Sequence, residues 1–317
     1  MLSTAAPLSP RTLRTVLASV ALAALGYLAL SLWAGWREVL AAVQLAGIGL
    51  LFGIALTTLN FALRYLRWRC YLAGLGHRLP WGEGCLIYLA GFSLTTTPMK
   101  LGETLRGLLS LRHGVPLGQS LAIFVSERLL DLAIVLALVA LGGSRFAIAQ
   151  PALWLGFFLV GLMLLTLLRP APLQRLTDMG AGAAQSWRRW LGRLAAMLLE
   201  TRRCQQPVQL VVGLLLGTLA WTLEGWAFHS LLQTMGLLND WPLALSIYMV
   251  AKLVGVLSML PGGVGGTEAA MAMLLHLAGV PLPAAVAATL LIRLLTLWYA
   301  VAVGAASLGL YLGRTRP

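Results

Sequence analysis

The stretch "SMLPGGVGGTEAA", residues 258–270, separates two apolar segments and contains three features that are unusual inside a membrane helix. Pro261 removes a backbone hydrogen bond, four glycines follow it closely, and Glu268 carries a charge. The stretch "TPMKLGETLR", residues 97–106, interrupts an earlier apolar region in the same way. Non-helical backbone is tolerated at membrane depth only where protein buries it or it lines a watery cavity. We therefore expect both stretches to be the tips of helical hairpins.

The composition indicates an integral membrane protein. Hydrophobic residues make up 59% of the 317 residues and charged residues only 10%, and the mean hydropathy is +0.86. Soluble domains are about a quarter charged. The net charge of +13 is attributed to arginines in short loops facing anionic lipid, because the chain has no basic platform interleaved with aromatic residues for nucleic acid. The predicted fold class is all-α, with a single membrane domain over residues 1–317.

The motifs that would indicate a metal, a cofactor or a catalytic centre do not occur. The three cysteines form no CxxC pair and the four histidines form no HExxH pattern. "GGVGG" resembles a nucleotide-binding loop only weakly, because it follows an apolar helix and no Lys-Ser or Lys-Thr ends it. We expect no metal, no cofactor and no catalytic residue.

Ten apolar segments follow one another along the chain. Six are long enough to span a membrane: 15–34, 45–66, 117–141, 152–168, 207–234 and 282–312. Four shorter segments form two pairs, broken at Pro98 and Pro261: 83–97, 101–111, 243–260 and 264–278. The first segment has a competing interpretation as a signal peptide, but no clear small-residue cleavage site lies near its end.

Four short motifs recur in the same order at nearly constant spacing, which predicts an internal duplication. "WGEGCLIY" pairs with "WPLALSIY", "PMKLGET" with "PGGVGGT", "GVPL" with a second "GVPL", and "RLLDL" with "RLLTL". The copies lie 160, 163, 165 and 165 residues apart. The same alignment places Gly76 at the position of Gly236, and Arg64 at that of Glu224.

The positive-inside rule then sets the topology. If each proline-broken pair is a re-entrant hairpin, six spans cross and both termini, the Arg67–Arg78 loop and the basic linker are cytoplasmic, with Arg145 outside. The single crossing between the two units makes the second an inverted copy of the first, which is a transporter architecture. The predicted regions are: an N-terminal span, 1–44; repeat unit 1, 45–141; a connecting span and basic linker, 142–206; and repeat unit 2, 207–312.

The basic linker, residues 169–206, carries seven arginines and an apolar stripe at helical spacing. The stripe consists of Trp187, Trp190, Leu191, Leu194 and Leu198. This pattern favours an amphipathic helix on the anionic cytoplasmic leaflet over a helix that docks another protein.

Charged residues within apolar segments are the candidate site, because each costs about 2.5–3.5 kcal/mol at a helix centre on insertion scales. Arg128 and Arg293 are expected at equivalent depths, facing a shared cavity. Two half-helix N-termini, one starting near Val264, would offer free N–H groups to an anion such as phosphate. The alternative is a set of internal ion pairs, for example Asp131 with Arg128. The candidate substrate-binding residues are Lys100, Glu103, Arg106, Glu127, Arg128, Asp131, Gly262, Gly263, Gly265, Glu268 and Arg293, joined by Glu224 and Lys252.

These motifs resemble the membrane part of lysylphosphatidylglycerol synthases and related stand-alone flippase-like proteins. The resemblance rests on "PMKLGETLR" (98–106), "SERLLD" (126–131), "PGGVGGTE" (261–268) and Arg293, and it covers nearly the whole chain. It implies movement of lipids with modified or glycosylated headgroups between leaflets. The synthases' soluble transferase domain has no counterpart here, so lysyl transfer is not implied.

The sequence therefore predicts a lipid flippase in the bacterial inner membrane, not an enzyme, with a phospholipid or a polyprenyl-phosphate-linked lipid as substrate. Two other interpretations remain: a non-transporting partner of a glycosyltransferase or lipid-modifying enzyme, and an intramembrane enzyme acting on lipid headgroups. The expected partners are anionic or glycosylated membrane lipids and no nucleic acid. A homo-oligomer, or an association with a lipid-synthesis enzyme, is compatible with the sequence.

Overall fold

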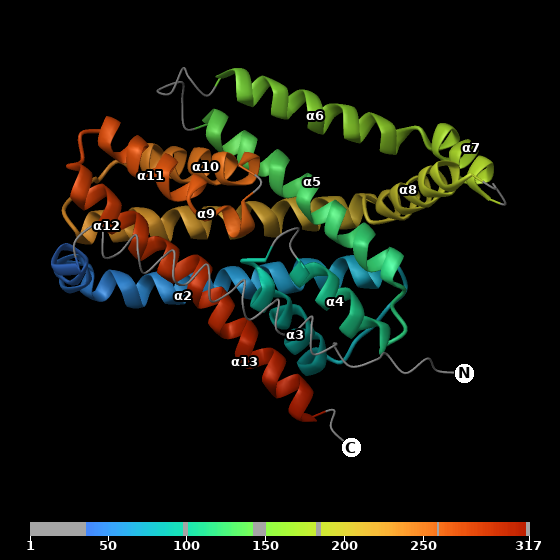
Figure 1. Ribbon diagram of the computed structural model, residues 1–317, viewed down its shortest axis with the longest axis horizontal. Helices are drawn as coiled ribbons and strands as arrows, with labels where there is room; N and C mark the ends of the chain where they lie inside the picture. Colours follow the sequence, from blue (N-terminus) through green and yellow to red (C-terminus); the bar gives the residue numbers. More distant parts are fainter. Residues whose placement is uncertain (1–35, 98–100, 142–149, 182–184, 259, 315–317) are drawn as a thin grey trace.

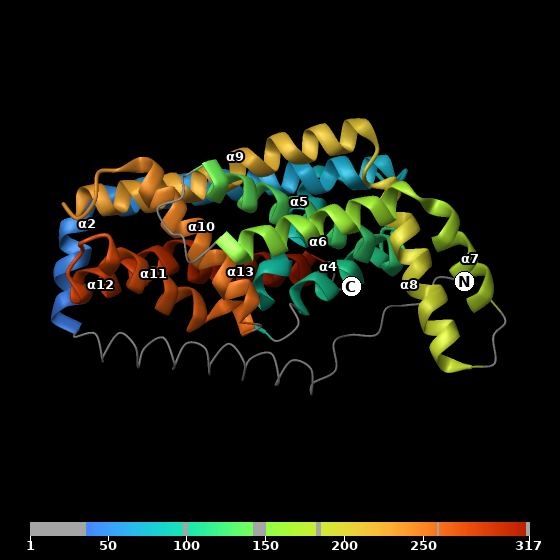
Figure 2. The same ribbon diagram turned by 90° about the horizontal axis from the view of Figure 1, so that it is seen from above.

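A computed structural model describes residues 36–97, 101–141, 150–181, 185–258 and 260–314 of the chain. The first predicted span, 15–34, lies outside these residues, as do Lys100 and Arg145. The described residues form long helices and two short helical pairs (Figures 1 and 2). The helices are α2 (Trp36–Gly74), α3 (Trp81–Ala90), α4 (Leu101–Leu111), α5 (Leu117–Leu141), α6 (Gln150–Leu168), α7 (Pro170–Gly180), α8 (Ser186–Arg203), α9 (Pro207–Thr234), α10 (Trp241–Leu257), α11 (Gly266–Leu277), α12 (Leu282–Arg293) and α13 (Tyr299–Arg314).

Three helical stretches in the described part have the length and hydropathy needed to cross a membrane: Val43–Gly74, Pro207–Thr234 and Leu282–Arg314. The last runs through α12, a π-helical turn (η5, Leu294–Trp298) and α13. Helix α5 has 25 residues but carries three charged residues near its middle. Helix α6 has 19 residues, of which Trp154–Met163 is a described apolar stretch. The prediction of an all-helical membrane protein is confirmed, whereas the count of six spans stays a prediction.

Helix α2 is longer than the sequence predicted. The apolar segment was expected to end at residue 66 and to be followed by a cytoplasmic loop beginning at Arg67. Instead the helix continues to Gly74, and the Arg67 side chain is 1% exposed. The prediction was wrong because Arg67 has a buried carboxylate partner, Asp131, and a paired charge can remain inside a helical bundle.

Helices α2 and α9 pack side by side along much of their lengths, one below the other in Figure 1. Gly49 near the start of α2 lies against Thr234 at the end of α9, and Gly74 at the end of α2 lies against Gln209 at the start of α9. The two helices are therefore antiparallel. The missing side chains of the glycines allow the close approach.

Four helix ends share one geometry at positions that the repeat aligns. Gly76 and Gly236 have φ angles of 87° and 67°, and Gly114 and Gly279 have 76° and 93°. The amide of the residue after each glycine donates to the carbonyl five residues earlier, as in a Schellman motif. These left-handed conformations explain why glycine occupies each position.

The two proline-interrupted regions form helical pairs. Helix α3 continues through a 3₁₀ turn (η1, Gly91–Leu94) and packs against α4, with Gly91 close to Gly102. Helix α10 packs against α11 across a second turn (η4, Pro261–Gly263), with Gly255 close to Thr267. The expected hairpins are therefore present as packed helices, while their re-entrant placement in a membrane stays a prediction.

The basic linker forms two helices where one was expected. Helices α7 and α8 pack together at the end of the molecule, on the far right in Figure 1, with Gly180 against Gly192. Trp187 and Trp190 are exposed on α8, whereas Leu198 packs against the core formed with α5 and α6. The predicted apolar stripe is therefore divided between an exposed end and a partly buried end.

Candidate functional site

Three arginines surround a single carboxylate, that of Asp131, where α2 meets α5. Arg67 Nη1 lies 2.7 Å from Asp131 Oδ1. Arg64 Nη1 and Arg128 Nη2 lie 3.2 and 3.0 Å from Oδ2. The side chains of Asp131 and Arg67 are buried, while that of Arg128 is 37% exposed. This part of the site therefore carries more positive than negative charge.

A second carboxylate, Glu224 on α9, extends this cluster through Arg64. Arg64 Nη2 donates to Glu224 Oε1 at 3.3 Å, and the Tyr248 hydroxyl donates to Oε2 at 2.7 Å. Lys252 Nζ lies 3.5 Å from Oε2. Asn60 donates to Glu224 and accepts from Arg64. The Arg64–Glu224 pair joins two positions that the repeat alignment had placed in register.

A third ion pair joins α4 to α5. Arg106 Nη2 donates to Glu127 Oε2 at 2.9 Å, and both side chains are almost fully buried. The Arg106 guanidinium lies 5.1 Å from the centre of the Tyr88 ring. Glu127 also interacts electrostatically with Arg67, so this pair belongs to the same charged region. Tyr88 and Tyr248 are repeat partners, and both lie at the site.

The fourth pair closes the tip of the second hairpin. Arg293 Nε donates to Glu268 Oε1 at 2.6 Å, and its Nη2 donates to the Gly262 carbonyl at 2.8 Å. The Gly265 amide donates to Glu268 Oε2 at 2.7 Å. The N-terminus of α11 is therefore capped by its own carboxylate. Glu268 therefore occupies one of the N–H groups at this end, that of Gly265, and the helix starts at Gly266, two residues after Val264.

These pairs form one network, because Arg293 also interacts electrostatically with Lys252. The described network holds six cations and four carboxylates, and six minus four leaves a surplus of two positive charges. The members are Arg64, Arg67, Arg106, Arg128, Lys252 and Arg293, with Glu127, Asp131, Glu224 and Glu268. Apart from Arg128, which is 37% exposed, these cations are largely buried, and a positive surplus that is partly buried is costly in a membrane protein and favours binding of an anion.

Most of the predicted site residues are brought together by the fold. The six charged residues in this group are Arg106, Glu127, Arg128, Asp131, Glu268 and Arg293. Lys100 lies outside the described residues, and Glu103 lies on α4 with its side chain outside them. The alternative of internal ion pairs is also confirmed for Asp131 with Arg128.

The sequence analysis missed the polar face of α2. Asn60, Arg64, Arg67 and Tyr71 follow the i, i+4, i+7, i+11 spacing of one helix face. In the sequence, Arg64 was noted only because the repeat aligns it with Glu224, and Arg67 was assigned to a loop. The spacing was a signal that could have placed both arginines in the site.

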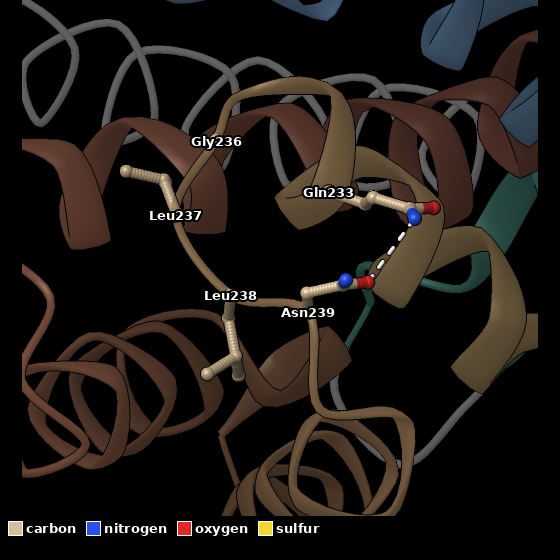
Figure 3. Close-up of a pocket in the computed structure, with 5 residues that line it drawn as sticks. All are labelled: Gln233, Gly236, Leu237, Leu238 and Asn239. Carbon is tan, nitrogen blue, oxygen red and sulfur yellow. Dashed lines mark hydrogen bonds between the residues drawn. The ribbon is translucent and has the colours of Figure 1, made fainter.

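A small hollow lies elsewhere, at the turn between α9 and α10 (Figure 3). It measures about 230 Å³ and is lined by Gln233, Gly236, Leu237, Leu238 and Asn239. Gln233 donates to Asn239 at 3.1 Å. Its lining contains no charged residue, so we assign the site to the charged network. Among the residues that the structure describes, no cluster of His, Cys, Asp and Glu could hold a metal ion.

The three tip glycines are expected to resist substitution for different reasons. Gly262, Gly263 and Gly265 have φ angles of 63°, 65° and 90°, a conformation that costs other residues about 1–2 kcal/mol. A Cβ on Gly263 would also lie 2.7 Å from Thr267 Oγ1, whereas one on Gly265 meets nothing closer than 3.7 Å. Gly265 combines φ 90° with ψ −58°, outside the left-handed region that other residues can adopt. Gly263→Ala, through its contact with Thr267, and Gly265→Ala, through its backbone conformation, should therefore both lower the melting temperature in detergent.

The control for this prediction is Gly309→Ala. Gly309 lies in α13 with open space around its Cβ position, so alanine should be neutral or slightly stabilising there. Equal melting temperatures for Gly263→Ala and Gly309→Ala would mean that the tip conformation is not required for folding.

The sequence of this chain matches a family of membrane proteins. The family model described as "Lysylphosphatidylglycerol synthase TM region" matches residues 16–304. A UPF0104 membrane protein of Methanothermobacter thermautotrophicus is 27% identical over 320 residues, covering 92% of this chain and 92% of that protein. A second UPF0104 membrane protein from the same organism is 29% identical over 99 residues, covering 31% of this chain and 29% of that protein.

Proposed function

This chain belongs to the lysylphosphatidylglycerol synthase transmembrane-region family, and we propose that it moves a lipid between the two leaflets of a membrane. The substrate is a phospholipid or a polyprenyl-phosphate-linked lipid with an anionic or glycosylated headgroup. The proposal assigns no covalent chemistry to the chain. The family description supports a membrane role related to lipids. The charged network supports the more specific proposal that this role is lipid transport.

The observation that carries the proposal is the surplus of two positive charges inside the network. A lipid phosphate that crosses a membrane must exchange its water for protein groups, and guanidinium groups bind phosphate oxygens in a bidentate fork. The four carboxylates temper the positive field, so that the headgroup can also be released. A purely structural network would be expected to balance its charges more closely.

We further propose that the two repeat units are inverted relative to each other. In support, α2 and α9 are antiparallel, and repeat partners on them touch: Asn60 donates to the Ala220 carbonyl, and Arg64 pairs with Glu224. Contacts between aligned positions of antiparallel helices are expected around a two-fold axis lying in the membrane plane. Inverted units with broken helices suit alternating access to a central site.

The topology that accompanies this proposal has six spans in the bacterial inner membrane, with both termini and residues 169–206 in the cytoplasm. We predict that a cysteine at Trp190, which is exposed on α8, reacts with an impermeant maleimide only after the cells are permeabilised. The background variant lacks Cys70, Cys85 and Cys204. A cysteine at Arg145 is the matched control and should react in intact cells. Labelling of position 190 in intact cells would contradict the inverted arrangement.

The function is tested by reconstituting the purified protein into liposomes with fluorescent lipids. A membrane-impermeant reductant bleaches the outer leaflet, and probes that cross are bleached in turn. We expect complete bleaching of at least one anionic or glycosylated lipid with the protein, and bleaching of about half without it. If every such lipid stays half protected, the chain does not transport these lipids, and a non-transporting role beside a lipid-modifying enzyme becomes the better explanation.

A further inference from the structure

The Arg67 guanidinium is buried but only partly used. Its Nη1 donates to Asp131, whereas Nε and Nη2 are buried and have no hydrogen-bond partner among the residues that the structure describes. The side chain is 1% exposed. Buried donors on a charged group are costly when they lack an acceptor. These two nitrogens therefore indicate the place of an acceptor that the described part of the chain does not supply.

Three further buried atoms that lack a hydrogen-bond partner within the described segments belong to residues around Arg67. They are Arg128 Nε, Tyr71 Oη and Glu127 Oε1. Tyr71 interacts electrostatically with Arg67 and Glu127, and Arg128 shares the Asp131 carboxylate with Arg67. The unused groups consist of guanidinium and hydroxyl donors together with one carboxylate acceptor. These atoms are buried, but the Arg128 side chain as a whole is 37% exposed, so this residue links the buried groups to the surface of the described structure.

We infer that these atoms form the headgroup subsite of the transported lipid. Arg67 and Arg128 donate to the phosphate, Tyr71 adds a hydroxyl donor, and Glu127 Oε1 accepts a hydrogen bond from the same headgroup. The ligand is thus a phosphate ester that carries a hydroxyl or amine beside the phosphate. The inference rests on the proposed function and names the headgroup chemistry that the site selects.

Charge and hydrogen bonding both favour this ligand over ordered water. Water can satisfy single donors, but it leaves the positive surplus of the network unbalanced. A phosphate supplies several acceptor oxygens and a negative charge together. The unpartnered oxygen of Glu127 would repel a bare anion, and a neighbouring hydroxyl or ammonium group removes that repulsion. Free phosphate lacks such a group and should bind more weakly.

The subsite is tested by binding, which does not depend on transport. The full-length protein in a neutral detergent is titrated with dihexanoyl-phosphatidylglycerol and, separately, with inorganic phosphate, by calorimetry. We expect Arg67→Gln to weaken binding of the lipid by roughly tenfold or more, which corresponds to the loss of a charge-assisted hydrogen bond. The matched control is Arg69→Gln, on the same helix, because Arg69 bonds Tyr65 and the Leu79 carbonyl outside the network.

Two outcomes of this titration would overturn the inference. One is wild-type affinity of Arg67→Gln for the lipid ester. The other is equal affinity of the wild type for inorganic phosphate and for the lipid, which would indicate a general anion site. If Arg67→Gln fails to fold, Arg67→Lys is measured instead. This variant keeps the positive charge but loses the bidentate guanidinium group, and it is expected to bind the lipid with intermediate affinity. Full affinity in Arg67→Lys would likewise contradict a bidentate role.

The role of Glu127 is tested with a second ester, dihexanoyl-phosphatidylmethanol, which has the same charge but no hydroxyl beside the phosphate. The wild type is expected to bind the glycerol ester more tightly, by about fivefold or more, the contribution of one hydrogen bond to a charged group. Removing Glu127 alone would leave Arg106 without this carboxylate, so the test variant combines Arg106→Met with Glu127→Leu. This variant should bind the two esters equally, and a retained preference would exclude Glu127.

Binding and transport can fail separately. If the esters bind with the expected pattern while no lipid crosses the liposome membrane, the proposed transport is contradicted and the subsite is still supported. If lipid crosses the membrane and Arg67→Gln binds the lipid ester normally, transport is supported and the subsite is wrongly placed.

Discussion

Asp131→Asn is expected to be among the most destabilising single substitutions in this chain. Asp131 is the shared carboxylate of Arg64, Arg67 and Arg128, and its side chain is only 6% exposed. Asparagine keeps the shape and removes the charge, leaving a buried guanidinium, that of Arg67, without its anion. Breaking a buried ion pair by removing one partner costs about 3–5 kcal/mol. Thermal unfolding in detergent should show a clearly lower melting temperature.

The control is Glu200→Gln, the same change of an acid to an amide at a surface pair. Glu200 pairs with Arg203, whose side chain is 62% exposed, and such pairs contribute about 0–1 kcal/mol. Glu200→Gln should therefore unfold near the wild-type temperature. If Asp131→Asn unfolds at that temperature too, the three arginines do not depend on Asp131, and the network is not organised around it.

Two aligned arginines are expected to behave differently when each is replaced by glutamine. Arg293 is 3% exposed and bonds both Glu268 and the Gly262 carbonyl. Arg293→Gln should therefore lose stability, by about 3 kcal/mol or more, because the buried Glu268 carboxylate loses its cation. Arg128 is 37% exposed, and Asp131 keeps two other arginines when it is removed. Arg128→Gln should unfold near the wild-type temperature.

From the sequence, Arg128 and Arg293 were expected at equivalent depths facing a shared cavity, whereas the structure gives their side chains different exposure and different partners. The two variants are compared by melting temperature and by the fraction that is monodisperse in detergent. Equal stability of Arg128→Gln and Arg293→Gln would mean that the contacts of Arg293 at the hairpin tip contribute little. Loss of folding in Arg128→Gln would make that arginine a structural residue.

The helices could be predicted from the sequence because the length of an apolar segment and the glycines near its ends are local signals. Gly76, Gly114, Gly236 and Gly279 recur at aligned positions of the repeat, and the structure shows that each follows the end of a helix. The end of α2 could not be predicted from hydropathy, because Arg67 is charged and only its tertiary partner explains its burial. The division of the linker into α7 and α8 depends on the close packing of Gly180 and Gly192, which no periodicity reveals.

The members of the site were more predictable than their pairing. Charges inside apolar segments identified Arg106, Glu127, Arg128, Asp131 and other members of the network, because the cost of burying a charge applies in any fold. Which carboxylate each arginine meets depends on how the helices pack. The α11 N-terminus illustrates the limit: the sequence places Glu268 near it, but only the structure shows that this carboxylate accepts a hydrogen bond from the Gly265 amide.

The most direct test of the account is lipid translocation by Arg128→Gln beside the wild type, in the liposome assay with the lipid that the wild type moves best. Arg128 is the exposed cation of a network that we assign to the headgroup. Because its removal should spare the fold, a loss of transport can be attributed to the site. The account predicts correctly inserted protein with wild-type thermal stability and translocation reduced by roughly tenfold or more, as expected for a lost guanidinium–phosphate contact. Stable Arg128→Gln that moves the lipid at the wild-type rate would contradict it.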